Sequence, residues 1–206
     1  LRQLFAIIRQ ARPSKLLLYQ DGARNEADRE LMQQCRDIVA DDQIDWECTV
    51  HRNYRDENRG CDPSNYLSVK WAFSLYDKCI KFEDDDQPSL SFFPFCKELL
   101  DRYENDLRVS IISGLNYDEV TPDVPYDYFF TTTFSINGWA TWRRVVDLWD
   151  DERYAFLDDS YNRRCNYQYR TGSYLHLRLE YGCTRCSISH STQSGRSGGL
   201  AVNEIP

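Results

Sequence analysis

Apolar residues recur along the first half of the chain with the periods of alternating helices and strands. The first twelve residues place Leu4 and Ile8 on one face, which predicts an amphipathic helix. The apolar run Lys15–Gln20 ends in an Asp-Gly turn sequence and predicts a strand. Because a helix like the opening one would normally follow a strand of its own, we expect a strand upstream of Leu1.

The same alternation continues as far as residue 113. The pattern predicts helices over 25–40, 61–78 and 91–106, and strands over 43–51, 79–82 and 108–113. In the first of these helices we expect Leu31, Cys35 and Ile38 on the buried side. Strands and helices that alternate at these lengths predict crossover connections and a mostly parallel sheet.

The rest of the chain is less regular. The segment 138–149 (GWATWRRVVDLW) predicts a turn that leads into a helix. Residues 187–206 are polar and rich in glycine, which predicts a loop or a flexible tail. The pattern indicates one α/β domain over residues 1–206, with regular structure in its first half.

Composition and charge narrow the class of protein. The chain is 41% hydrophobic and 14% aromatic, which is typical of a globular protein. A net charge of −8 argues against nucleic acid as a partner, because phosphate binding needs a basic face. We expect no transmembrane segment, since no apolar run is long enough to cross a bilayer. The eight cysteines are scattered and too few for a disulfide scaffold.

Four acidic residues, Glu83 to Asp86, follow directly on the predicted strand 79–82, and Asp21 follows the strand 15–20. In parallel α/β sheets, ligands bind beyond the carboxyl ends of the strands. Adjacent carboxylates repel one another, and a divalent cation offsets that cost. Mg²⁺ and Mn²⁺ bind one or two carboxylates together with substrate phosphates. The residues therefore predict a cation site, and a solvated acidic turn is the alternative interpretation.

The segment 80–116 (IKFEDDDQPSLSFFPFCKELLDRYENDLRVSIISGLN) resembles the core of the GT-A glycosyltransferases. Within them it is similar to the branch of Golgi N-acetylglucosaminyltransferases and their bacterial and viral relatives. That branch carries a Glu-Asp-Asp triplet at a strand end, a helix with a Pro-aromatic pattern, and a strand that runs into Ser-Gly-x-Asn. Three further matches follow the same order: YQDGAR (19–24), NRGCDPSNYLSVKWAF (58–73) and INGWATWRR (136–144).

The resemblance covers roughly residues 1–150. It implies a GT-A, Rossmann-like fold with a mostly parallel sheet flanked by helices and a less regular C-terminal acceptor-side part. It implies metal-dependent, inverting transfer of a sugar from a nucleotide-sugar donor, with a UDP-sugar favoured, to a glycan or other hydroxyl acceptor. Mn²⁺ or Mg²⁺ would neutralise the diphosphate leaving group. A cytoplasmic enzyme of the bacterial or viral type is favoured over one of the Golgi lumen.

The resemblance also implies roles for individual residues. The metal ligand is Asp85, and His190 lies where relatives place a late residue that contacts metal or phosphate. The implied donor-binding residues are Asp21, Gly22, Glu83, Asp84, Asn116 and Arg196. Asp21 would accept a hydrogen bond from the base, and an ordinary Asp-Gly turn is the other interpretation. Asp86 exceeds the triplet, and we expect it either to support the ligands or to be solvated.

On the acceptor side we expect Trp139 and Trp142, one as a wall for a sugar ring and the other as a core anchor. Inversion needs a general base on the acceptor hydroxyl. Similarity to the Golgi branch favours Asp159, with Asp158 as its rival. Similarity to the bacterial branch instead places Asn166 at that position, which would leave the base missing. The alternative functions are a non-catalytic relative that binds nucleotide or glycan, and a nucleotidyltransferase of related fold.

Overall fold

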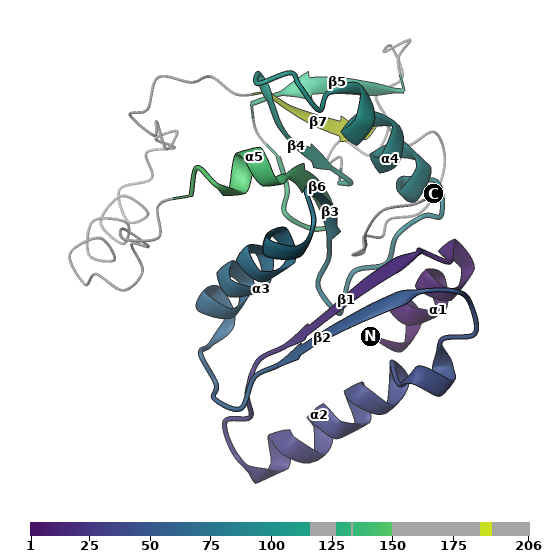
Figure 1. Cartoon of the computed structure of the whole chain (residues 1–206), viewed down its shortest axis with the longest axis vertical. Helices are drawn as coiled ribbons and strands as arrows, with labels where there is room; N and C mark the ends of the chain where they lie inside the picture. The colour runs from purple at the N-terminus through teal and green to yellow at the C-terminus, as the bar shows by residue number, and fades with distance from the viewer. Residues whose placement is uncertain (116–126, 133, 150–185, 191–206) are drawn as a thin grey trace, which may run out of the picture.

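Two β-sheets form the centre of the molecule in Figure 1, a computed structural model that describes residues 1–115, 127–132, 134–149 and 186–190. The first sheet pairs β1 (Lys15–Gln20) with β2 (Thr49–Tyr54) in parallel. The second sheet has the strand order β3-β6-β4-β7-β5. Its strands are β3 (Lys78–Lys81), β4 (Val109–Ser113), β5 (Tyr128–Thr131), β6 (Trp139–Trp142) and β7 (Cys186–His190). The predicted α/β class is confirmed.

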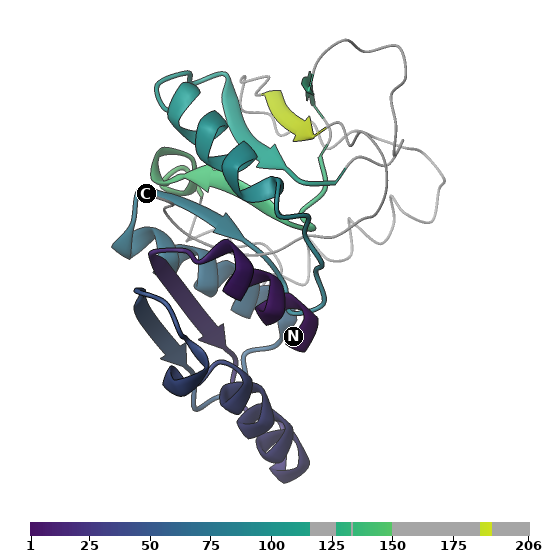
Figure 2. The same ribbon diagram turned by 90° about the vertical axis from the view of Figure 1, so that its right-hand side faces the viewer.

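Helices cover both faces of these strands (Figure 2). They are α1 (Arg2–Ala11), α2 (Glu26–Ile38), α3 (Cys61–Leu75), α4 (Phe92–Arg102) and α5 (Arg143–Val146). The start of α2 is fixed by Asn25, whose side chain accepts a hydrogen bond of 2.9 Å from the backbone N–H of Asp28. No helix in the described part of the chain is long and apolar enough to span a bilayer.

The core is divided between the two faces of the sheets, because neighbouring residues of a strand point to opposite sides. In β3, Ile80 packs in a cluster with α1 and α4, whereas Cys79 packs in a second cluster with α3 and α5. In β4, Ile112 and Ile111 divide in the same way. A strand of this fold therefore needs apolar side chains on both faces.

The prediction of a single, mostly parallel sheet is wrong. Among the described strands, parallel pairing occurs only between β1 and β2 and between β4 and β7. β6 lies antiparallel between β3 and β4, and β5 is antiparallel to β7. The segment that carries β6 was expected to be a turn and a helix. All four of its residues, Trp139–Trp142, are instead buried in the sheet, and only the short helix α5 follows.

Three local predictions also need correction. The second strand begins at Thr49 instead of residue 43, after a 3₁₀ turn over Asp41–Gln43. Trp46 lies before that strand, where its indole N–H donates to the carbonyl of Pro13 at 2.7 Å. Leu31 is 60% exposed instead of buried. Residues 187–190, expected in a loop, belong to β7, which pairs with strands on both sides.

Candidate functional site

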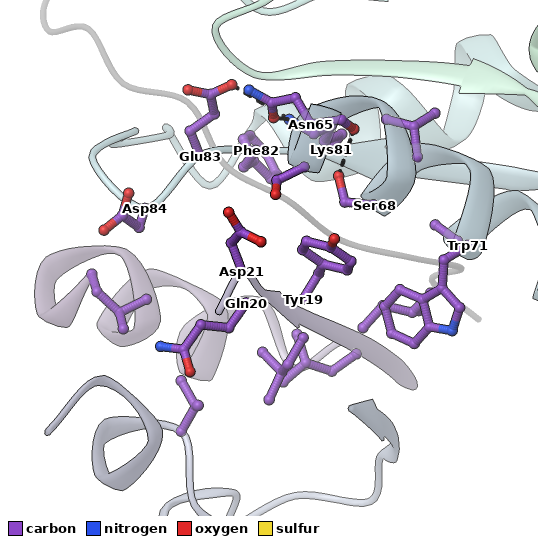
Figure 3. Close-up of a pocket in the computed structure, with 18 of the residues that line it drawn as sticks. Tyr19, Gln20, Asp21, Asn65, Ser68, Trp71, Lys81, Phe82, Glu83 and Asp84 are labelled. Atoms are coloured by element: carbon purple, nitrogen blue, oxygen red, sulfur yellow. Dashed lines mark hydrogen bonds and ion pairs between the residues drawn. The ribbon is translucent and has the colours of Figure 1, made fainter. Parts of the chain in front are cut away.

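A pocket of about 470 Å³ lies between β1 and β3. One part of it, which we call the apolar slot, is lined by Leu4, Ile8, Leu16, Leu18, Val69 and Ile80. The other part, the polar rim, consists of Asp21, Asn65, Lys81, Glu83 and Asp84. Figure 3 shows that the acidic residues of the rim come from the ends of two different strands. The expected gathering of Asp21, Glu83 and Asp84 at one place in the fold is therefore present.

Lys81 links two other groups of the polar rim. Its ammonium group donates to the side-chain oxygen of Asn65 at 2.6 Å and lies 3.4 Å from a carboxylate oxygen of Glu83. The lysine side chain is only 18% exposed, so this ion pair is partly shielded from solvent. Glu83 therefore already has a cationic partner, and the rim combines both signs of charge.

The carboxylate of Asp21 holds the loop before α3. It accepts hydrogen bonds of 3.0 Å from the backbone N–H groups of Arg59 and Gly60 and from the side-chain amide of Asn58. Burial acts to raise the pKa of Asp21, but the hydrogen bonds that its carboxylate accepts, that from the backbone N–H of Arg59 above all, outweigh burial and lower it. Most of its acceptor capacity is thus used within the protein.

Gly22 has a packing role beside the same loop. It is buried, and a Cβ at this position would clash with the backbone carbonyl carbon of Glu57 and the backbone nitrogen of Asn58. Only glycine allows the turn after β1 to lie this close to the loop, and Asn58 then donates to the carbonyl of Gly22 at 2.8 Å. Gly22 therefore contributes to the site by letting the turn after β1 pack closely against this loop.

Asp86 fixes the acidic turn from inside. Its side chain is 8% exposed, and its carboxylate accepts a hydrogen bond of 2.9 Å from the backbone N–H of Glu83. Burial raises the pKa of Asp86, against the lowering effect of that hydrogen bond, and the charges of Asp85 and Glu83 add to the rise. Asp86 is therefore not the solvated residue of one expectation, and it supports the turn that carries Glu83, Asp84 and Asp85.

Asp84 and Asp85 are exposed, and neither forms an ion pair with another described residue. In the part of the chain that the structure describes, no three His, Cys, Asp or Glu side chains converge to hold a metal ion. The described side chains alone therefore do not enclose a metal ion. Exposed carboxylates fit the other way in which Mg²⁺ and Mn²⁺ bind, with one or two carboxylates and the phosphates of a substrate.

The two tryptophans predicted on the acceptor side belong to the core. Trp139 is 6% and Trp142 is 2% exposed, and the indole N–H of Trp142 donates to the carbonyl of Leu100 at 2.9 Å. A sugar ring needs an open aromatic face, so the expected role of one of them as an acceptor wall is wrong. The core-anchor role applies to both.

The other predicted residues cannot be placed in the site. Asn116, Asp158, Asp159, Asn166 and Arg196 lie outside the described residues. The backbone of His190 ends β7, opposite Tyr128 in the register with β5.

Sequence reasoning missed several groups of the pocket. The phenol of Tyr19 packs against the indole of Trp71, with ring centroids 6.3 Å apart, and its hydroxyl is buried without a hydrogen bond to a described residue. Asn65 and Ser68 line the pocket from α3. They are polar residues at i and i+3 beside the apolar stripe of that helix, and this spacing was the available signal.

Comparison with known proteins adds no information about the function of this site. The sequence matches no protein-family model, and no curated protein matches it. The chemistry of the site therefore rests on its geometry.

Proposed function

We propose that this chain is a metal-dependent glycosyltransferase of the GT-A type that uses a nucleotide-sugar donor, with a UDP-sugar favoured. The observation that carries the proposal is the meeting of Asp21, Glu83 and Asp84, from the carboxyl ends of β1 and β3, around one end of one pocket. The carboxyl ends of parallel strands are where α/β folds bind nucleotides. The acidic turn at this place supports the binding of a diphosphate through a divalent ion.

The role that we propose for each residue follows from the hydrogen bonds and ion pairs that it already makes within the protein. Asp84 and Asp85 are exposed and would hold Mn²⁺ or Mg²⁺ together with the donor phosphates. Such an ion neutralises a diphosphate leaving group. Asp21 would act by holding the loop 57–60, since its carboxylate is already hydrogen-bonded there. The Tyr19 hydroxyl, which lines the pocket and makes no hydrogen bond to a described residue, would turn towards a ribose or base.

The acceptor hydroxyl must lose its proton to a base in an inverting transfer. Asp159, with Asp158 as the alternative, remains our proposal for this base. A glycan or another hydroxyl compound is the proposed acceptor.

A non-catalytic protein that binds nucleotide or glycan is the second candidate. The ion pair of Glu83 with Lys81 favours it, because this carboxylate already has a cationic partner within the protein. A protein of this kind would bind nucleotide without breaking the sugar–phosphate bond.

Isothermal titration with UDP, in the presence and absence of Mn²⁺, tests the proposed binding of nucleotide. An assay of sugar release from UDP-sugars, with and without acceptors, then tests the proposed catalysis. We expect metal-dependent binding and slow release of sugar. Metal-dependent binding with no release under any acceptor would favour the binding protein. No nucleotide binding, with a panel of nucleotides and both metals, would exclude the transferase and the nucleotide-binding form of the second candidate.

A further inference from the structure

Lys81 carries a positive charge at the acidic end of the pocket (Figure 3). It is the last residue of β3, and its ammonium group reaches the side chain of Asn65 on α3. Among the described residues, the other cationic side chain that lines the pocket is Arg36, and its guanidinium donates to the side chain of Gln20 at 2.7 Å. Lys81 is therefore the cationic side chain that the polar rim offers to an anionic ligand.

The ammonium group of Lys81 has one more donor than it has partners. Such a group carries three N–H bonds. One is directed to the side-chain oxygen of Asn65 at 2.6 Å, and a second reaches the Glu83 carboxylate at 3.4 Å, beyond the usual range of a strong hydrogen bond. No other residue in the described part of the chain accepts from this group. The third N–H is thus available to a ligand, and the weak contact with Glu83 is exchangeable.

Asn65 holds the ammonium group in place. Its side-chain oxygen accepts from Lys81, and its side-chain nitrogen donates to the sulfur of Cys61 at 3.8 Å, so both ends of the amide have partners. The side chain of Lys81 is 18% exposed, against 39% for that of Glu83. A cation that is already ordered loses little conformational entropy when an anion binds. The geometry therefore favours Lys81 as a binding group over a lysine that moves freely in solvent.

The proposed metal site does not by itself balance the charge of a diphosphate. The two carboxylates of Asp84 and Asp85 together cancel the charge of one divalent ion. The diphosphate, still negatively charged, would then lie beside the carboxylate of Glu83. Like charges held close together repel one another, and the repulsion grows where solvent is partly excluded. A cation of the protein offsets this repulsion, and Lys81 has both the charge and the available donor.

We infer that the ammonium group of Lys81 binds a phosphate group of the nucleotide directly, with its third N–H and in exchange for its contact with Glu83. Asn65 is the residue that positions it. Nucleotide binding then has two electrostatic components, one through the divalent ion and one through this lysine. The inference rests on the proposed function and adds a contact to it that needs no metal.

Isothermal titration with UDP and with uridine, both in the presence of Mn²⁺, tests the inference. Lys81→Met removes the charge and keeps a side chain of similar length. We expect the affinity for UDP to fall about tenfold or more, and that for uridine, which has no phosphate, to stay unchanged. The matched control is Lys78→Met at the other end of β3, where the ammonium group pairs with Asp101 at 2.8 Å and Glu104 at 3.1 Å. This variant should bind UDP as the wild type does.

A second pair of variants separates direct contact from an action through Glu83. In Glu83→Gln the carboxylate charge is absent, so Lys81 has nothing left to neutralise there. We expect the double variant Lys81→Met/Glu83→Gln to bind UDP about tenfold more weakly than Glu83→Gln alone. Equal affinities of these two proteins would overturn the inference, because Lys81 would then act only on Glu83.

The wild-type protein supplies a measurement that does not depend on the folding of any variant. Acetylation of lysines by acetic anhydride is followed by mass spectrometry with and without ligand. UDP with Mn²⁺ should slow the acetylation of Lys81 several-fold and leave that of Lys78 unchanged, and uridine should protect neither. Equal acetylation of Lys81 with and without UDP, or metal-dependent UDP binding that Lys81→Met does not weaken, would overturn this inference alone. A wild-type protein that binds no nucleotide would overturn it together with the proposed function.

Discussion

The carboxylate of Asp86 accepts a hydrogen bond of 2.9 Å from the backbone N–H of Glu83, three residues earlier in the chain. Burial raises the pKa of Asp86, so the folded state holds the proton more tightly than the unfolded chain does. The stability from this difference is present below the usual value of 3.8 and is lost as the pH rises through the raised pKa. The ionised carboxylate of Asp86 therefore lowers the free energy of unfolding at neutral pH.

This relationship predicts opposite effects of two substitutions. Asp86→Asn keeps an acceptor for Glu83 and removes the buried charge, so its free energy of unfolding at pH 7 should equal or exceed that of the wild type. Asp86→Ala leaves the N–H of Glu83 without its partner and should cost about 1 kcal/mol. Urea unfolding between pH 3 and pH 8 measures both. A loss as large for Asn as for Ala would mean that the negative charge itself stabilises the turn.

Asp21 should show the opposite dependence on pH. Hydrogen bonds from the loop lower its pKa, so its stabilising effect is present above 3.8 and is lost as the pH falls through the lowered value. Asp21→Asn replaces one accepting oxygen by a donor that faces other donors. We expect a cost of about 1.5 kcal/mol at pH 7, because the site is partly open to solvent. The same urea series checks it, and a cost that stays constant below pH 4 would contradict the assignment.

Gly22→Ala should be among the most destabilising changes near the site. The added Cβ meets backbone atoms of Glu57 and Asn58, which cannot move aside like a flexible side chain, and we expect a cost of about 3 kcal/mol. Gly60→Ala is the matched control. Its Cβ meets no atom within 4 Å, and only its φ of +85° disfavours a side chain, at about 1 kcal/mol. Thermal unfolding of both variants measures the difference, and equal Tm values would show that the turn and the loop lie further apart.

Asp85→Ala tests the proposed metal ligand. The side chain is exposed and has no ion pair with a described residue, so its removal should leave the Tm within about 1 °C of the wild type. Metal-dependent binding of UDP should fall at least tenfold. The control Glu47→Ala removes an exposed carboxylate just before the amino end of β2, away from the polar rim, and should bind as the wild type does. Unchanged metal dependence in Asp85→Ala would remove it from the site.

Trp142→Phe tests the core role of the second tryptophan. The substitution removes the donor to the carbonyl of Leu100 and leaves space in a fully packed sheet, so we expect a cost of about 2 kcal/mol. Trp71→Phe, at the half-buried wall of the pocket, should cost less than about 1 kcal/mol. Urea unfolding compares them. A Trp142→Phe protein with wild-type stability but weaker acceptor binding would return this residue to the acceptor side.

The sequence predicted those elements whose period is set within a short window. Three elements lie close to their expected positions. They are the helix that buries Leu4 and Ile8, the strand Lys15–Gln20, and the strand that comes just before the acidic turn. β6 was missed because Trp139 and Trp142 are spaced as on a helix. Its structure is decided by pairing with β3 and β4, which are distant in the chain.

In the site, the sequence predicted the residues that follow strand ends, but it did not predict their hydrogen-bond partners. Asp21 and Glu83 were found because strand ends can be located from the pattern of the sequence. The hydrogen bond from Lys81 to Asn65 could not be predicted, since it depends on which face α3 turns towards β3. The number of hydrogen bonds that Asp21 accepts was also unpredictable, because their donors lie 37 to 39 residues further along the chain.

The place of β6 between β3 and β4 also governs the order of events during synthesis. These two strands are neighbours in the sequence, yet they touch in the sheet only through a strand that ends at Trp142. When residue 113 leaves the ribosome, the backbone N–H and C=O groups at the facing edges of β3 and β4 still lack the strand that pairs with both. Closure of this sheet must wait for a late segment, which predicts slow folding and a need for protection of the nascent chain.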